Sequence, residues 1–132
     1  NWKSKRQIST ENPDWILPWY FNLVNATGVS LHQFDLPGYP ASHSCIRLRM
    51  EDAQWIYEQA RQWRLSADQN QVLGQGSPVI IYGAYPFGKA RPWYVLAKDS
   101  SALNQSADSL NTIIQPHLEQ MLKEQHVRDR IQ

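Results

Sequence analysis

Residues 31–48 read LHQFDLPGYPASHSCIRL and carry most of the reactive side chains of the chain. Two imidazoles, a thiol and a guanidinium fall within sixteen residues, across a loop that Pro37, Gly38 and Pro40 make too irregular for a helix or strand. The segment therefore predicts one chemical site, built from the two ends of a rigid loop. Its candidate residues are His32, Ser42, His43, Ser44, Cys45 and Arg47.

The single cysteine, Cys45, excludes an intrachain disulfide framework and a multi-cysteine zinc site. A lone thiol is either a buried hydrophobic residue or a nucleophile. A nucleophilic cysteine needs a nearby histidine, a group that orients that histidine, and N–H groups directed at the oxygen that becomes negative. His32, and the turn through His43 to Cys45, can meet these needs. A metal site with His32, His43 and Cys45 as ligands is the alternative, with Asp35 as the nearby carboxylate.

The sequence before the loop predicts a hairpin. An extended segment begins at Trp15, a reversal follows at residues 25–28 with Gly28 supplying a positive φ, and a second strand covers residues 28–33. Alternation places His32 on the face opposite Val29 and Leu31. Replacement of His32 is therefore expected to leave the fold largely intact. Residues 1–14 are interpreted as a solvated polar arm that ends in a turn at residues 12–14.

The sequence after the loop predicts helices and short strands. Apolar spacing and two acidic residues in the first turn indicate a helix from about Glu51 to Trp63. Residues 66–77 are interpreted as a polar connector, and residues 78–82 and 93–97 as strands. Residues 105–130 are predicted to be helical, kinked at Pro116, with an apolar stripe that packs on the domain.

Composition limits the classes of function. The 132 residues suit one domain, and a mean hydropathy of −0.57 excludes a membrane-spanning helix. A net charge of +1 gives no electrostatic reason to bind nucleic acid. The chain begins at Asn1 without a segment typical of export signals, so we expect a processed or trimmed piece.

The residues from His32 to Arg47 resemble the active-site motif of the L,D-transpeptidases, the YkuD-like catalytic domain of bacterial cell-wall enzymes. That motif is a His, a loop, and then Ser/Thr-His-Gly-Cys followed by an apolar residue and Arg or Asn. The similarity extends into ILPWYFNLVNATGVSLH, EDAQWIYEQA and GSPVIIYG, and covers roughly residues 15–83. It implies a mainly β domain with α (α+β), of the YkuD-like sandwich or sheet type. The expected divisions are an arm at 1–14, a catalytic domain at 15–98 and a helical extension at 99–132.

The resemblance also implies a role for each candidate residue. Cys45 is the nucleophile and His32 the base that activates it, and a main-chain carbonyl, that of Gln33, orients His32. The N–H groups around Ser44 and Cys45 form the oxyanion site, to which Ser42 also belongs. His43 shapes the pocket. Arg47 either braces the motif or meets a substrate carboxylate.

The implied reaction is acyl transfer on peptidoglycan stem peptides in the periplasm or cell envelope, with no metal or organic cofactor. A Cys45 thioester passes to an amine, giving a 3→3 cross-link or a protein attached to the wall. Two alternatives remain open at this point. One is a carboxypeptidase or hydrolase with the same nucleophile, and the other is a catalytically silent peptidoglycan-binding module.

Two departures from the family pattern carry expectations of their own. The glycine before the family's cysteine is Ser44 here, which would strain the loop by about 1–3 kcal/mol if that position needs a positive φ. Only 31 residues precede His32, fewer than the family usually has. We therefore expect either that the chain lacks the first part of the domain or that another element replaces the missing strands, which residues 1–14 are not expected to supply.

Overall fold

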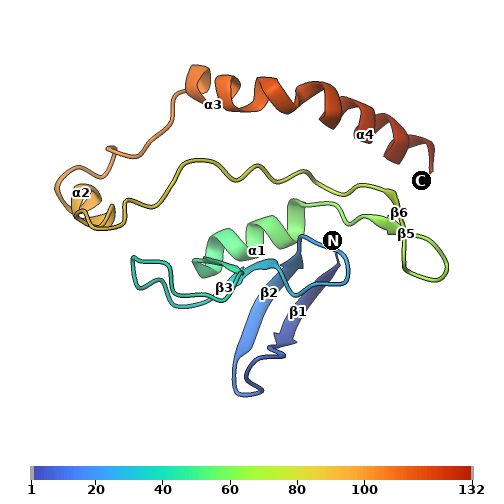
Figure 1. Cartoon of the computed structure of the whole chain (residues 1–132), viewed down its shortest axis with the longest axis horizontal. Helices are drawn as coiled ribbons and strands as arrows, with labels where there is room; N and C mark the ends of the chain where they lie inside the picture. Colours follow the sequence, from blue (N-terminus) through green and yellow to red (C-terminus); the bar gives the residue numbers. More distant parts are fainter. Residues whose placement is uncertain (1, 132) are drawn as a thin grey trace.

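The computed structural model describes residues 2–131 and has an α+β architecture (Figure 1). One sheet has the strand order β1-β2-β3-β4, and a second, two-stranded sheet pairs β5 with β6. Among the described residues, no helix has the length and apolar character that crossing a membrane requires. The elements are β1 (Lys3–Ile8), β2 (Ile16–Asn22), β3 (Ser30–Gln33), β4 (Ile46–Leu48), α1 (Met50–Gln59), β5 (Arg64–Leu65), β6 (Val72–Gly74), α2 (Trp93–Lys98), α3 (Ala107–Ile114), the 3₁₀ helix η1 (Gln115–His117) and α4 (Leu118–Arg130).

The expected N-terminal arm is wrong for residues 3–8, which form the edge strand β1. This strand pairs antiparallel with β2, from Lys3 opposite Phe21 to Ile8 opposite Ile16. The ammonium of Lys3 lies 5.8 Å from the centre of the Phe21 ring and donates a hydrogen bond to the Tyr57 carbonyl. A lysine can thus occupy an edge strand, because its long stem covers apolar surface while its charge stays near water. The basic residues of this segment therefore belong to an edge strand of the sheet rather than to a free arm.

The predicted hairpin is confirmed as β2 and β3, which pair antiparallel with Phe21 opposite Leu31 and Asn22 opposite Ser30. The positive φ of its turn belongs to Ala26 (φ 60°), not to Gly28 as expected. The reason lies in the buried side chain of Asn22, whose Nδ2 donates to the carbonyls of Thr27 (2.7 Å) and Val29 (3.3 Å). These bonds hold residues 27–29 in position and move the left-handed residue earlier in the turn.

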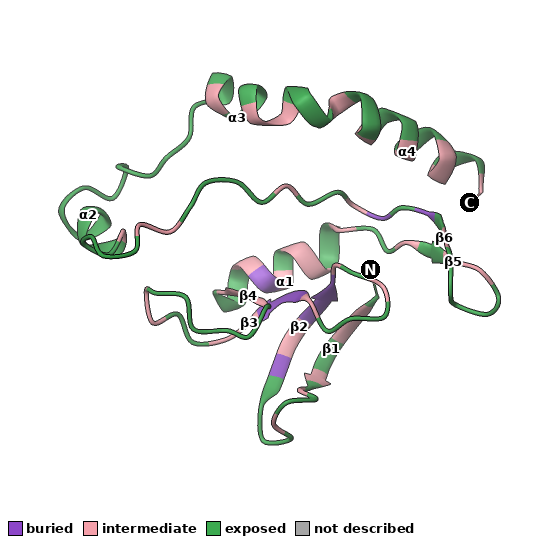
Figure 2. Cartoon of the chain, in the orientation of Figure 1, coloured by how far each residue is buried: buried purple, intermediate pink, exposed green. Residues whose placement is uncertain are grey.

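The core lies between this sheet and α1. Phe21 and Ala53 are almost fully buried, and Leu17, Tyr20 and Leu31 complete the buried apolar set (Figure 2). Because β4 pairs parallel to β3, with Leu31 opposite Ile46, the chain must cross over between them. Residues 34–45 make that crossing, and the parallel register brings the residue before β4 beside the start of β3.

Several expectations for the remainder of the chain are wrong. The helix predicted to reach Trp63 ends at Gln59, and the polar connector contains β5 and β6, which pair with each other. Residues 78–82 form no strand, and Ile81 is 73% exposed. Residues 93–98 form helix α2 instead of a strand. These segments have strand-like composition but no partner strand among the described residues, so alternation alone gave the wrong state.

The helical C-terminal region is confirmed, and Pro116 lies in the 3₁₀ turn η1 that separates α3 from α4. The expected packing of its apolar stripe is not found, because α3 and α4 have no buried residues. Contact with the rest of the chain is concentrated at the C-terminal end of α4. There Arg128 donates to the carbonyls of Gln75 (3.3 Å) and Gly76 (3.0 Å). Figure 1 shows α3 and α4 following one another along one edge of the view, with the C-terminal end of α4 near β6.

Candidate active site

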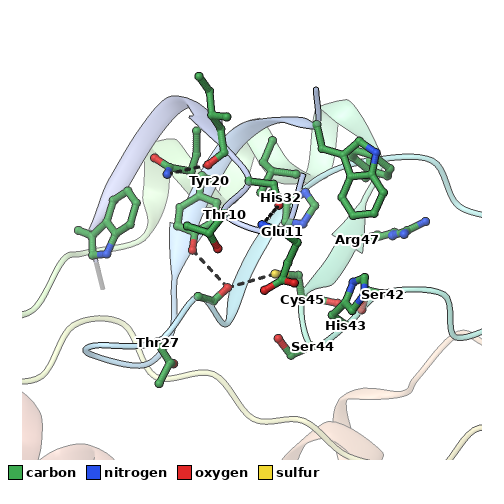
Figure 3. A pocket seen from close by; sticks show the side chains of 18 of the residues that line it. Thr10, Glu11, Tyr20, Thr27, His32, Ser42, His43, Ser44, Cys45 and Arg47 are labelled. Atoms are coloured by element: carbon green, nitrogen blue, oxygen red, sulfur yellow. Dashed lines mark hydrogen bonds between the residues drawn. The ribbon is translucent and has the colours of Figure 1, made fainter. Parts of the chain in front are cut away.

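A cavity of about 440 Å³ opens beside the sheet and is lined by both His32 and Cys45. Its walls come from the turn between β2 and β3, the turn between β1 and β2, and the residues just before β4. Figure 3 shows the Cys45 sulfur and the His32 ring on one side of this cavity, with Ser42, His43 and Arg47 grouped beside them. Folding therefore places the strand-borne imidazole and the thiol, thirteen positions apart in the sequence, on the wall of one cavity.

His32 is only 3% exposed and lies between two aromatic rings. The Tyr20 ring stacks on it at 6.4 Å, and the Phe34 ring meets it edge-on at 5.9 Å. Nδ1 of His32 donates to the carbonyl of Gln33 at 2.9 Å, so in the neutral ring the free lone pair is on Nε2. Burial lowers the pKa of His32, the bond to Gln33 opposes that effect, and the charge of Arg47 lowers the pKa further. The ring is thus favoured in its neutral form, as a general base requires.

The Cys45 sulfur is half-buried and has two hydrogen-bond partners. Its S–H donates to the Gly28 carbonyl (3.2 Å), and it accepts from the hydroxyl of Ser30 (3.3 Å). The Gly28 carbonyl also accepts from the Tyr20 hydroxyl (3.3 Å), and both bonds to it are drawn in Figure 3. No direct hydrogen bond joins His32 to Cys45. The structure therefore holds a resting thiol, and in enzymes without substrate such catalytic contacts are often long.

The turn from Ser42 to Cys45 is held by the Ser42 hydroxyl, which donates to the Cys45 carbonyl. Within the described chain, the main-chain N–H groups of Ser44 and Cys45 have no main-chain acceptor. N–H groups without a main-chain partner are what an oxyanion site requires. The backbone at Ser44 is not in the positive-φ region that only a few described non-glycine residues occupy. The strain expected from Ser in place of Gly is thus absent.

Arg47 holds the loop rather than pointing freely into the cavity. Its guanidinium donates to the carbonyls of Asp35 (3.2 Å) and Ala41 (2.7 Å) and lies 4.7 Å from the centre of the Phe34 ring. Of the two roles that the resemblance left open, this geometry favours the brace. Arg47 ties both ends of the crossing to β4.

His43 is exposed, and its ring lies 6.1 Å from the Trp15 ring at the wall of the cavity. Among residues 2–131, no group of three His, Cys, Asp or Glu side chains could hold a metal ion. The alternative ligand set of His32, His43 and Cys45 is therefore not assembled.

The loop between His32 and Cys45 is also contacted from outside. At Gly38 (φ +76°) an added Cβ would lie 2.2 Å from the indole of Trp93 in α2. The Tyr85 hydroxyl donates to the Gly38 carbonyl (3.3 Å), and the Arg91 guanidinium lies 4.7 Å from the centre of the Tyr39 ring. Residues 85–93 thus pack on the outer side of the active-site loop.

Sequence reasoning did not single out Ser30 and Tyr20 as parts of the site. A signal for Ser30 was present, because it lies two residues before His32 and so shares its face of β3. No comparable signal marked Tyr20, because its contact with the Gly28 carbonyl depends on the hairpin register.

Comparison with known families agrees with this geometry. The model of the YkuD L,D-transpeptidase catalytic domain matches residues 1–81. The chain belongs to this family. No curated protein and no solved structure matches it. The family match includes β1, which the sequence interpretation had left outside the domain, and every candidate site residue.

Proposed function

We propose that this chain is a cysteine acyltransferase of the L,D-transpeptidase type, acting on peptidoglycan stem peptides. The observation that carries the proposal is the shared cavity of Cys45 and His32, with the ring oriented by Gln33. Family membership supports the reaction class, and the substrate is expected where peptidoglycan lies, outside the cytoplasm. No metal or organic cofactor takes part in the proposed reaction.

The first step forms the thioester. The Cys45 thiol gives its proton to Nε2 of His32, and the thiolate attacks the carbonyl carbon of the third residue of a tetrapeptide stem. The N–H groups of Ser44 and Cys45 stabilise the negative oxygen of the tetrahedral intermediate. The intermediate then breaks its C–N bond, and the leaving D-alanine amine takes the proton from His32.

The second step transfers the acyl group. An acceptor amine attacks the thioester carbon and loses a proton to His32, and the returning thiolate recovers that proton. A second stem peptide as acceptor gives a 3→3 cross-link, and an amine of a protein attaches that protein to the wall. Water as acceptor would make the same site a carboxypeptidase.

The decisive experiment measures intact mass after incubation with a carbapenem, which acylates an active cysteine of this type. We expect one covalent adduct per chain, located on Cys45 by peptide mapping and abolished in Cys45→Ala. An unmodified protein whose Cys45 still reacts with a small thiol reagent would overturn the proposal and favour the silent binding module.

Turnover is then measured as D-alanine release from a tetrapeptide stem. His32→Gln is the informative variant, because His32 is buried between Tyr20 and Phe34 and an alanine there would leave a cavity. The expectation that removal of this side chain spares the fold is therefore revised. We expect turnover to fall at least 100-fold in His32→Gln, in line with loss of a general base. The exposed His126 supplies the control His126→Gln, with unchanged turnover.

Products separate transfer from hydrolysis. A stem peptide supplied with an amine acceptor should yield the cross-linked amide, whereas tripeptide alone would indicate the hydrolase alternative.

We also propose that the catalytic unit extends past the family match to about residue 98. The contacts of Tyr85, Arg91 and Trp93 with the active-site loop support this boundary. Residues 99–132 then form the helical extension.

A further inference from the structure

Ser30 is a fully buried hydroxyl, with 0% of its surface exposed, next to the proposed nucleophile. Its Oγ lies 3.3 Å from the Cys45 sulfur, to which it donates. Ser30 does not line the cavity, whereas Cys45 does. The sulfur therefore lies between the open cavity and this hydroxyl. Burying a hydroxyl without a partner costs about 1–3 kcal/mol, so the contact with sulfur accounts for a serine at this core position.

The backbone register makes this contact a rigid one. β3 pairs parallel with β4 at Leu31 opposite Ile46, which sets Ser30 beside Cys45. Strand alternation puts Ser30 on the same face as His32. One short strand thus carries both the base and a hydroxyl that contacts the nucleophile. The distance between these two groups is fixed by the strand and not by a loop.

We propose that Ser30 is a positioning residue for Cys45, holding its sulfur and stabilising its thiolate. This inference rests on the proposed function for the role of the thiolate in acyl transfer. Ser30 keeps its proton throughout and forms no covalent bond. It acts through a hydrogen bond from its O–H to the sulfur.

The two partners of the sulfur respond in opposite ways when the thiol ionises. The bond to the Gly28 carbonyl needs the S–H proton, so it is lost when that proton moves to His32. The bond from Ser30 needs only a lone pair on sulfur, and hydrogen bonds to a charged acceptor are about twice as strong as neutral ones. Ser30 therefore favours the thiolate over the thiol, and Gly28 favours the thiol.

The test compares Ser30→Thr with Ser30→Val, two variants of nearly equal shape of which only the threonine keeps a hydroxyl. The readout is the rate of alkylation by iodoacetamide, which reports Cys45 alone because the chain has one cysteine. At pH 7 we expect Ser30→Val to react about tenfold more slowly than Ser30→Thr, which should stay near the unmodified protein. At pH 10 the difference should shrink, because there ionisation no longer depends on a hydrogen bond from the hydroxyl.

Ser30→Ala provides a second comparison without added volume, and thermal unfolding verifies that each variant is folded. Ser77→Ala is the control, since the Ser77 hydroxyl accepts from the Arg61 N–H, in a contact separate from the site. Equal alkylation of Ser30→Thr and Ser30→Val at pH 7 would overturn the proposal, as would a difference that persists at pH 10. The alkylation needs no peptidoglycan substrate. If Ser30→Thr and Ser30→Val differ clearly in alkylation rate but no carbapenem adduct forms, the role of Ser30 is supported and the proposed function is rejected.

Discussion

Two regions of the molecule have similar apolar content but different burial. The first, called the paired half, is the four-stranded sheet with α1 (residues 2–60), and the second half is residues 77–131. Every buried hydrophobic residue lies between Leu17 and Ala53, whereas no residue of the described range 77–131 is buried (Figure 2). Phe21 is fully buried in the first half, and Phe87 in the second is 76% exposed. The total accessible surface is 9,689 Å², against about 7,100 Å² expected for a compact chain of this mass.

The difference teaches that strand pairing, not apolar content, produces the core here. In the first half four strands are hydrogen-bonded in one sheet and α1 covers them. In the second half Val79 and Ile81 lie in an apolar segment that has no partner strand among the described residues. The candidate site residues all belong to the paired half. The candidate site therefore lies on the part of the chain that contains the buried core.

The largest expected effect contrasts two phenylalanines. Phe21→Ala should lower the free energy of unfolding by about 3–5 kcal/mol, because it empties the centre of the core. Phe87→Ala should change it by less than about 0.5 kcal/mol, since that ring is mostly in water. Urea unfolding followed by circular dichroism measures both. A similar loss of unfolding free energy in the two variants would show that the halves are equally packed and would contradict the difference in burial described above.

A smaller effect is expected at Asn22, which holds the turn beside the site. Asn22→Ala removes two hydrogen bonds to carbonyls of residues 27 and 29, and should cost about 1–3 kcal/mol of stability. Carbapenem acylation of Cys45 should also slow, because the Gly28 carbonyl lies in this turn. Asn104→Ala, at an exposed position in the second half, is the control. A stable Asn22→Ala protein with normal acylation would show that the turn does not affect the reactivity of Cys45.

Arg128 tests whether the second half unfolds by itself. Arg128→Met removes the bonds to the carbonyls of Gln75 and Gly76, so hydrogen exchange in α4 should accelerate about fivefold while β2 and β3 keep their protection. The control is Arg130→Met, because the Arg130 guanidinium donates to the His126 carbonyl of its own helix. Loss of protection in the sheet as well would mean that the two halves unfold together.

The smallest expected effect is a pH dependence that arises in the paired half. Burial lowers the pKa of His32 below its ordinary value of 6.5, so the unfolded chain binds this proton more readily than the folded chain does. Stability contributed by neutral His32 is complete above pH 6.5 and declines as the pH falls below it. Melting temperatures between pH 7.5 and 5 should therefore fall less in His32→Gln than in the unmodified protein. The exposed His117 gives the control variant His117→Gln, with the unmodified slope. Equal slopes in all three proteins would exclude His32 as the source.

The sequence was sufficient to predict the hairpin of the paired half because its signals were local or specific. Alternation around His32 and the turn at residues 25–28 predicted the hairpin, and the motif through Cys45 named two residues that line one cavity, His32 and Cys45. The polar composition of residues 1–14 was misleading, because residues 3–8 form strand β1. A polar edge strand and a solvated arm have the same composition, and only a partner strand distinguishes them.

The sequence was least informative where structure depends on distant contacts. Trp93 begins an apolar run that fits a strand, yet it lies in α2, against Gly38 of the active-site loop. Ser30 could be placed beside His32 by alternation, but its contact with Cys45 depends on the parallel pairing of β3 and β4. Such pairings join segments that no local pattern links.

The contact between Gly38 and Trp93 has a consequence for engineering this protein. Gly38 has a positive φ, and the indole occupies the space that any larger residue there would need. A mutational library restricted to cavity-lining positions would miss this contact, since neither residue lines the cavity. Randomising Tyr85 and Trp93 should instead yield variants with changed turnover and an unaltered substrate-binding surface.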